Sequence, residues 1–145
     1  MRLVLFFTCG VSLDTWIQSG LFDREKLIYE EHLKRGHIDT VYWLTYGSND
    51  DVIARDLHSR DKLHPNINVI PMPAIFESKI GKILYSFFIP FLQRQYLKAA
   101  RVYKTNQIYG SWTAVLAKFF FGIPLIVRAG YIPSLLEKKN KDFGL

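Results

Sequence analysis

Short apolar segments alternate along this chain with segments of helical patterning. Residues 3–7, 40–45, 67–70, 102–104 and 124–127 have the composition of strands, and residues 21–35, 79–101 and 112–121 have that of helices. The first run, Leu3-Val4-Leu5-Phe6-Phe7, is apolar throughout, as in strands that are covered on both faces. A repeated strand–helix–strand order with mostly short links predicts a parallel sheet with helices on both sides. We therefore expect an α/β fold, a doubly wound parallel sheet flanked by helices.

Three connecting segments complete this interpretation. Residues 8–20 are expected to form a loop that is long for a strand-to-helix link, and residues 51–65 a polar connection. The helical region 79–101 contains Pro90, which predicts a kink or a split at that position. The length of 145 residues fits one domain that spans residues 1–145. The single cysteine, Cys9, forms no internal disulfide, which indicates a reducing, cytoplasmic compartment.

The chain is basic, with a net charge of +6. This charge indicates an anionic partner, but no nucleic-acid recognition motif accompanies it, so we expect no nucleic acid. No stretch reaches the roughly 18 apolar residues of a spanning helix, so the surface of a membrane is the better anionic candidate. Residues 79–104 are basic and aromatic enough to lie in a membrane interface, with Phe87, Phe88 and Phe91 inserted. The alternative packs these phenylalanines against the sheet and leaves only the charges outside.

Several common site chemistries are excluded by inspection. The sequence has no GxGxxG after its first strand, no GxxxxGK[ST], no HExxH and no Asp-x-Asp pair. The four histidines show no ligand spacing. We therefore expect neither a bound cofactor nor a metal ion.

Polar residues collect where the predicted strands end. In open α/β sheets, ligands bind outside the carboxyl ends of the strands, often at helix N-termini. In the first loop, Gly10 and Gly20 would let backbone approach a ligand, and Arg24 and Glu25 follow in the first turn of the next helix. The alternative for Arg24 is an ion pair with a neighbour, and for Glu25 an interaction with the helix dipole.

The fourth and fifth predicted strands are each followed by a cation. Lys104 comes directly after a buried strand, where a charge needs a partner. With Asn106 it could hold a hydroxyl or a phosphate, and the alternative is a structural ion pair with helix capping by Asn106 or Ser111. Arg128 follows the last strand and is suited to binding a phosphate or carboxylate. The remaining candidate binding residues of these two loops are Gln107, Gly110, Gly130 and Tyr131.

The order of these motifs resembles the N-terminal half of family-4 glycosyltransferases of the GT-B fold, and more narrowly a bacterial branch of that family. The resemblance rests on an opening of the form LFFTxGVSLxTW, followed by GxFxRE…Y, TYG, KTNQxxG and RxGY. These motifs stand here at residues 5–16, 20–29, 45–47, 104–110 and 128–131.

The resemblance implies a retaining, metal-independent transferase whose first domain binds the acceptor and whose second domain binds the nucleotide-sugar. The Glu-x7-Glu motif of the family's second domain is missing here, so we expect a fragment that carries the acceptor half and is inactive alone. By resemblance, residues from Thr8 to Trp16 line the acceptor cleft, Lys104 and Asn106 contact phosphates, and Arg128 stabilises the leaving diphosphate.

The substrates expected from the resemblance are a nucleotide-sugar and a glycan or lipid-linked acceptor. The expected location is the cytoplasm, with peripheral contact to the anionic inner face of the membrane. The alternative function is a non-catalytic Rossmann-like module that binds a phosphate-bearing ligand or a protein partner at the same edge.

Overall fold

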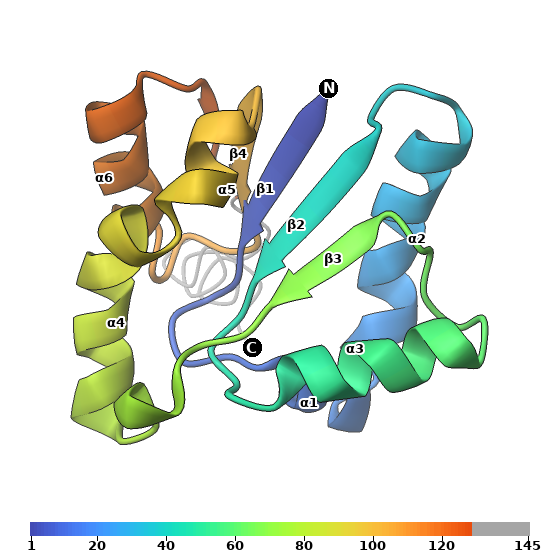
Figure 1. Ribbon diagram of the computed structural model, residues 1–145, viewed down its shortest axis with the longest axis horizontal. Helices are drawn as coiled ribbons and strands as arrows, with labels where there is room; N and C mark the ends of the chain where they lie inside the picture. The colour runs from blue at the N-terminus through green and yellow to red at the C-terminus, as the bar shows by residue number, and fades with distance from the viewer. Residues whose placement is uncertain (129–145) are drawn as a thin grey trace, which may run out of the picture.

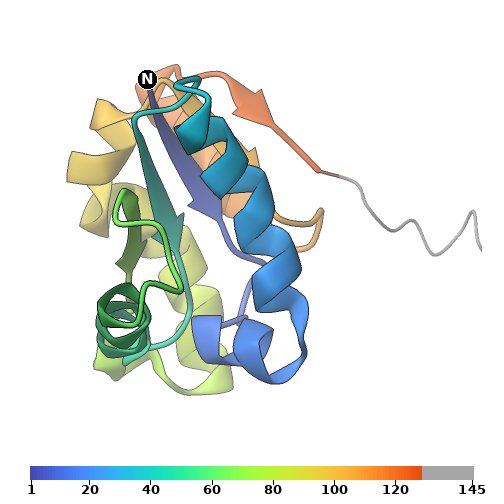
Figure 2. The same cartoon turned by 90° about the vertical axis from the view of Figure 1, so that its right-hand side faces the viewer.

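The computed structural model describes residues 1–128, which form a five-stranded, all-parallel sheet between helices (Figures 1 and 2). The strand order is β3-β2-β1-β4-β5, and the strands are β1 (Arg2–Phe6), β2 (Thr40–Leu44), β3 (Ile67–Ile70), β4 (Val102–Thr105) and β5 (Leu125–Ile126). Helices α2 (Leu21–Lys34) and α3 (Asp50–Ser59) lie on one side of the sheet in Figure 1. Helices α4 (Lys79–Leu92), α5 (Arg94–Ala99) and α6 (Trp112–Phe121) lie on the other. The predicted doubly wound α/β fold is confirmed.

The strands next to the central strand β1 end in register with it. Phe6 pairs with Leu44 of β2 on one side and with Thr105 of β4 on the other. The chain order reverses between β1 and β4, because β2 and β3 extend the sheet in one direction and β4 and β5 extend it in the other. Such a switch point is where ligands bind in open α/β sheets.

Two helices occupy segments that we expected to lack them. Residues 8–20 contain α1 (Leu13–Gln18), and the predicted polar connection 51–65 contains most of α3. The signals were present: Ser12 caps α1 by accepting from the N–H of Thr15 at 3.1 Å, and α3 begins with two aspartates. Helix α1 has only six residues and buries two of them, too few for a periodic pattern. Helix α3 does have an amphipathic pattern, which we overlooked because the segment is polar overall.

A break in the helix was predicted at Pro90, and the structure places it at Gln93, three residues further on. Helix α4 continues to Leu92, and α5 begins after Gln93. Pro90 has no N–H to donate to the carbonyl of Ser86, four residues earlier. That carbonyl instead accepts from the Thr113 hydroxyl of α6 at 2.7 Å, and the Ser86 hydroxyl accepts from the indole N–H of Trp112 at 2.9 Å. The proline thus frees a polar group that joins α4 to α6.

The sheet face under α2 is covered by an aromatic cluster. The ring of Trp43 in β2 is fully buried, and four other aromatic rings lie with their centroids between 5.3 and 6.5 Å from its own. These rings belong to Phe7, Trp16, Phe22 and Tyr29. Because they come from the loop after β1 and from α1 and α2, the cluster holds this whole crossover on the sheet.

The phenylalanines of α4 are not buried against the sheet. Phe87, Phe88 and Phe91 are 48%, 47% and 59% exposed, while Tyr85 and Ile89 of the same helix are buried. The alternative that packed these phenylalanines inward is therefore wrong. Within residues 1–128, no helix has both the length and the apolar character needed to cross a membrane.

The substitution Thr113→Val tests the link made by Pro90. It removes the donor to the buried Ser86 carbonyl, and we expect the free energy of unfolding to fall by about 1–3 kcal/mol in urea denaturation. In a Pro90→Ala background the restored N–H can donate to the same carbonyl, so the loss should shrink. Equal losses in the two backgrounds would contradict the proposed role of the proline.

Candidate functional site

A buried carboxylate lies at the end of β4 and β5, where α2 begins. Glu25 of α2 is only 2% exposed. Its two oxygens accept from Arg128 at 2.7 Å and from Arg24 at 3.3 Å. The backbone N–H of Arg128 donates to the hydroxyl of Thr105, the last residue of β4, at 3.1 Å. Glu25 therefore fixes Arg128 at the carboxyl edge of the sheet, across 103 residues of sequence.

Lys104 adds a further cation to this group. Its ammonium lies 5.1 Å from the centroid of the Tyr29 ring, within the electrostatic influence of Glu25 and Arg128. Burial lowers the pKa of the Lys104 ammonium and Arg128 lowers it further, while Glu25 opposes the shift. Arg24 and Arg128 pair with Glu25, whereas Lys104 forms no ion pair among the described residues. The three cations therefore outnumber the one carboxylate between them. An anionic ligand would supply the missing charge.

Of the structural alternatives proposed for these residues, the one for Arg24 is observed and the capping contacts proposed for Asn106 and Ser111 are not. Arg24 does pair with its neighbour Glu25, as its alternative predicted. Lys104 lies over an aromatic ring, and neither predicted capping contact forms: Ser111 makes no side-chain bond to α6, and Oδ1 of Asn106 is buried without a hydrogen-bond partner among the described residues. An unpaired buried oxygen is costly, which marks Asn106 as a group that a ligand donor could satisfy.

Gly110 brings the loop after β4 against the loop after β1. Its φ is +84°, and a Cβ added there would lie 2.7 Å from the backbone nitrogen of Cys9. The structure therefore gives Gly110 a packing reason to be glycine. Gly10 and Gly20 also have positive φ, but a Cβ at either would meet nothing within 4 Å. Whether any of the three contacts a ligand remains a prediction.

The other predicted site residues fall in different places. Thr8 and Gln107 are half-buried in the loops after β1 and β4, close to the switch point. Trp16 is 1% exposed and stacks on Phe7 with 4.0 Å between ring centroids, so its side chain belongs to the core. Gly130 and Tyr131 lie outside the described residues.

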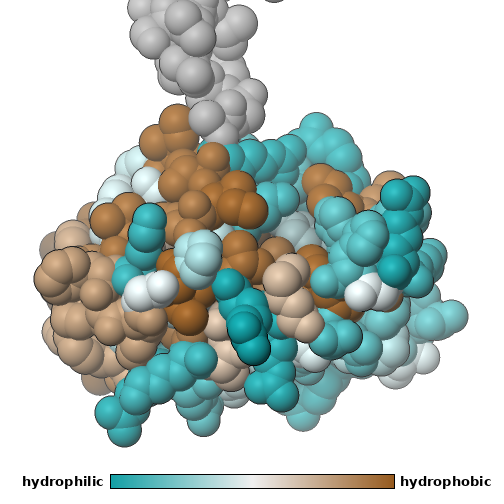
Figure 3. Space-filling view, turned by 90° about the horizontal axis from the view of Figure 1, so that it is seen from above, coloured by the Kyte–Doolittle hydropathy of each residue, from teal (hydrophilic) through white to brown (hydrophobic). Residues whose placement is uncertain are grey.

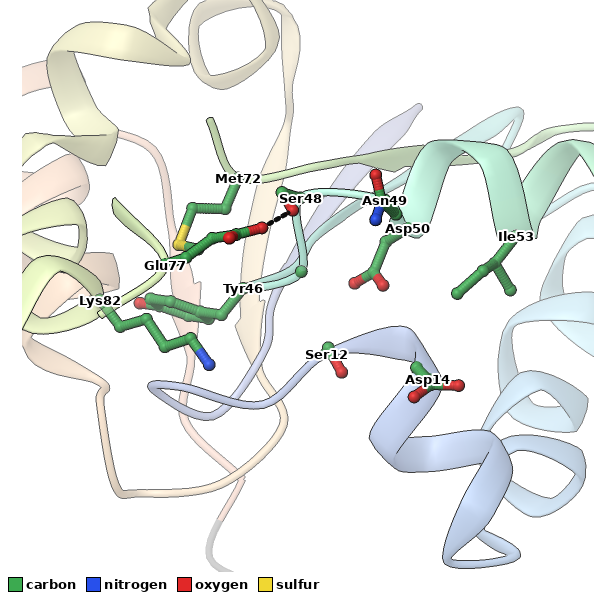
Figure 4. Close-up of a pocket in the computed structure, with 11 residues that line it drawn as sticks. Ser12, Asp14, Tyr46, Ser48, Asn49, Asp50, Ile53, Met72, Glu77 and Lys82 are labelled. Atoms are coloured by element: carbon green, nitrogen blue, oxygen red, sulfur yellow. Dashed lines mark hydrogen bonds between the residues drawn. The ribbon is translucent and has the colours of Figure 1, made fainter. Parts of the chain in front are cut away.

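A pocket at the other half of the edge is lined in part by the predicted cleft segment from Thr8 to Trp16, through Ser12 and Asp14 (Figure 4). The rest of its lining was not predicted as a site. The pocket has a volume of about 390 Å³ and lies beyond the ends of β1, β2 and β3. Its lining is mostly carboxylates, hydroxyls and an amide, with one lysine: Ser12, Asp14, Tyr46, Gly47, Ser48, Asn49, Asp50, Ile53, Met72, Glu77 and Lys82. The turn signal Gly47-Ser48-Asn49-Asp50 marked this place, but we interpreted it only as the end of a strand.

The walls of this pocket are held by hydrogen bonds to carboxylates. Asp50, which is buried, accepts from the backbone N–H of Leu13 at 2.8 Å and so ties α1 to α3. Gly47 is required beside it, because an added Cβ would lie 2.4 Å from the Asp50 carboxylate. Ser48 donates to Glu77, and Figure 4 shows Lys82 on the same side of the pocket as Glu77, extending toward its centre. Such a surface suits a ligand that carries many hydroxyl groups.

Residues 1–128 contain no group of three or more histidines, cysteines, aspartates or glutamates that could hold a metal ion. The expected independence of metal and cofactor stays a prediction. Comparison of the chain with protein-family models, curated proteins and solved structures finds no match. The resemblance to family-4 glycosyltransferases therefore still rests on the sequence motifs alone.

The Glu25–Arg128 pair can be tested by a double-mutant cycle. Arg128→Met leaves a buried carboxylate with only the weaker Arg24 contact, and we expect the free energy of unfolding to fall by about 1–3 kcal/mol. In the Glu25→Gln background the same change should have a smaller effect. The control cycle uses Glu31 of α2 and Arg35, the C-cap residue of this helix, an exposed pair at 2.8 Å, whose coupling should be about 0.5 kcal/mol or less. Similar coupling in both cycles would contradict the burial argument.

The close approach at Gly110 has a matched control in Gly36. Both glycines have positive φ, but a Cβ at Gly36 would meet nothing within 4 Å. Gly36→Ala should therefore lower the free energy of unfolding by about 1–2 kcal/mol from backbone strain alone. Gly110→Ala must also push Cys9 away, so urea denaturation should show a clearly larger loss. Equal losses would mean that the two loops separate without penalty.

Proposed function

We propose that this chain is the acceptor-binding part of a glycosyltransferase that transfers a sugar from a nucleotide-sugar to a glycan or lipid-linked acceptor. The observation that carries the proposal is the surplus of positive charge around Glu25, at the carboxyl edge of the sheet. A nucleotide-sugar leaves as a diphosphate, and guanidinium and ammonium groups stabilise that developing charge. Five sequence motifs in register support the same class.

In this proposal, one half of the carboxyl edge binds the donor and the other half binds the acceptor. Arg128 and Lys104, at the ends of β5 and β4, face the phosphates of the donor. The pocket beyond β1, β2 and β3 receives the acceptor, whose hydroxyl groups donate to Asp14 and Glu77 and accept from Lys82. The Glu25 carboxylate positions Arg128 and does not contact substrate in this scheme. Metal-free stabilisation of the diphosphate by these cations agrees with the expectation from the resemblance.

Binding of inorganic pyrophosphate to the 145-residue chain tests the charge argument. Pyrophosphate should raise the melting temperature, with a stabilisation of about 2.7 kcal/mol at 100 times Kd. Arg128→Lys should weaken binding because it loses the bidentate geometry while keeping the charge. Lys104→Met should also weaken binding but stabilise the free protein, because it removes a half-buried cation. Lys62→Met, an exposed lysine distant in sequence from these residues, serves as the control.

Turnover is tested on the full-length gene product with common sugar nucleotides. Transfer that falls in Arg128→Lys supports the proposal and the role of Arg128. Pyrophosphate binding without turnover of any donor by folded protein would contradict the transferase and favour the non-catalytic module. Equal activity in Arg128→Lys would leave Arg128 a structural residue.

A further inference from the structure

The outward face of α4 is apolar along its whole length. Apart from Lys79, every exposed residue of this helix is a large apolar one: Ile80, Ile83, Leu84, Phe87, Phe88, Phe91 and Leu92. They recur at the spacing of one helix face. A surface helix ordinarily turns its polar face to water and its apolar face to the core.

The inward face of the same helix combines two large buried side chains, Tyr85 and Ile89, with small or polar groups. Gly81, Tyr85, Ser86, Ile89 and Pro90 are its buried residues. Gly81 allows the backbone of Phe76 to approach, since an added Cβ would lie 2.7 Å from the Phe76 carbonyl oxygen. Close packing of Gly81 and the polar contacts of Ser86 hold α4 in this orientation, and its large side chains are left outside.

Helix α6 continues the apolar surface. Its buried residues are Thr113, Ala114 and Ala117, whereas Phe119 is 82% exposed. The rings of Phe91 and Phe120 are 5.3 Å apart, and those of Phe87 and Trp112 are 6.2 Å apart, so the two helices form one surface. Figure 3 shows apolar side chains gathered on the side of the molecule where α6 lies in Figure 1. We call this surface the α4–α6 face. A contiguous apolar surface of this kind marks an interaction site.

All charged side chains in the part of the chain that contains α4 and α6 are positive. The sequence contains no aspartate or glutamate between Glu77 and Glu137. Within the described residues, the same stretch carries Lys79, Lys82, Arg94, Lys98, Arg101, Lys104, Lys118 and Arg128. Lys79 and Lys118 are exposed on α4 and α6 themselves, beside Ile80 and Phe119. The α4–α6 face therefore fits a partner that is apolar and, because Lys79 and Lys118 lie on its two helices, also anionic.

We propose that the α4–α6 face binds the surface of an anionic lipid bilayer, with α4 and α6 lying in the interface. The phenylalanines enter the boundary between headgroups and acyl chains, and Lys79 and Lys118 contact lipid phosphates. A second copy of the chain fits less well, because a two-fold interface would bring the same cations together. The inference goes beyond the proposed transferase and stands whether or not the carboxyl edge binds a nucleotide-sugar.

Co-sedimentation of the full chain with lipid vesicles tests the proposal. The chain should sediment with vesicles of phosphatidylcholine and phosphatidylglycerol, more weakly with phosphatidylcholine alone, and less as salt is raised. The double variant Phe87→Ser/Phe119→Ser should bind about tenfold more weakly, since it removes two inserted rings. Lys118→Glu should weaken binding only to the anionic vesicles.

The matched control is Leu27→Ser on α2, in the opposite helix layer, where the leucine is 60% exposed. It should bind vesicles as the unchanged chain does. All substituted side chains point outward, and circular dichroism checks that each variant is folded. Absence of vesicle binding, binding that ignores lipid charge, or an equal loss in Leu27→Ser would overturn the proposal. A lipid-free dimer in sedimentation equilibrium that Phe87→Ser/Phe119→Ser dissociates would assign the face to a second copy instead.

Discussion

The packing of aromatic rings on Trp43 is the interaction on which both halves of the candidate site depend. Trp43 lies in β2, paired with Leu5 and Val69 of the neighbouring strands, so its position is set by the sheet. The rings around it come from the β1 loop, α1 and α2. Helix α2 carries Glu25, which orients Arg128, and α1 begins next to Ser12 of the pocket. The cluster thereby places a charged site and a polar pocket along one edge of the sheet.

The helices on the two faces of the sheet are packed by different kinds of side chain. On the α2 side, large aromatic rings fill the space between helix and sheet. On the α4 side, Tyr85 packs on Tyr46, and Pro90 frees the Ser86 carbonyl. The inner contact between α4 and α6 is made by that carbonyl, the Thr113 hydroxyl and small side chains, while aromatic pairs join the two helices at the surface. Large residues of α4 and α6 are then left on the outside. The unusual outer surface of this layer follows from how its inner contacts are made.

Much of the site could be predicted because it follows from the fold. Lys104 and Arg128 were identified as cations placed directly after strands, and parallel strands bring such residues to one edge. Arg128 does follow β5, whereas Lys104 lies within β4, one residue before its end. Their arrangement could not be predicted: Glu25 reaches Arg128 across the sheet edge, and Lys104 lies on Tyr29. Most of the pocket at the other half was missed because residues 51–65 were interpreted as a polar connection, although α3 has the amphipathic pattern of a helix.

The sequence by itself determined the position of the strands along the chain, their parallel orientation and the polar character of the carboxyl edge. Continuous apolar runs such as residues 3–7 have few alternatives to a doubly covered strand, and strand–helix alternation leaves few topologies. Only the tertiary structure decided which face of residues 79–92 turns inward, because both faces carry apolar residues and periodicity cannot choose between them. Contacts of Gly81, Ser86 and Thr113 made that choice. Together with the burial of Tyr85 and Ile89 on the inward face, these contacts leave the three phenylalanines outside.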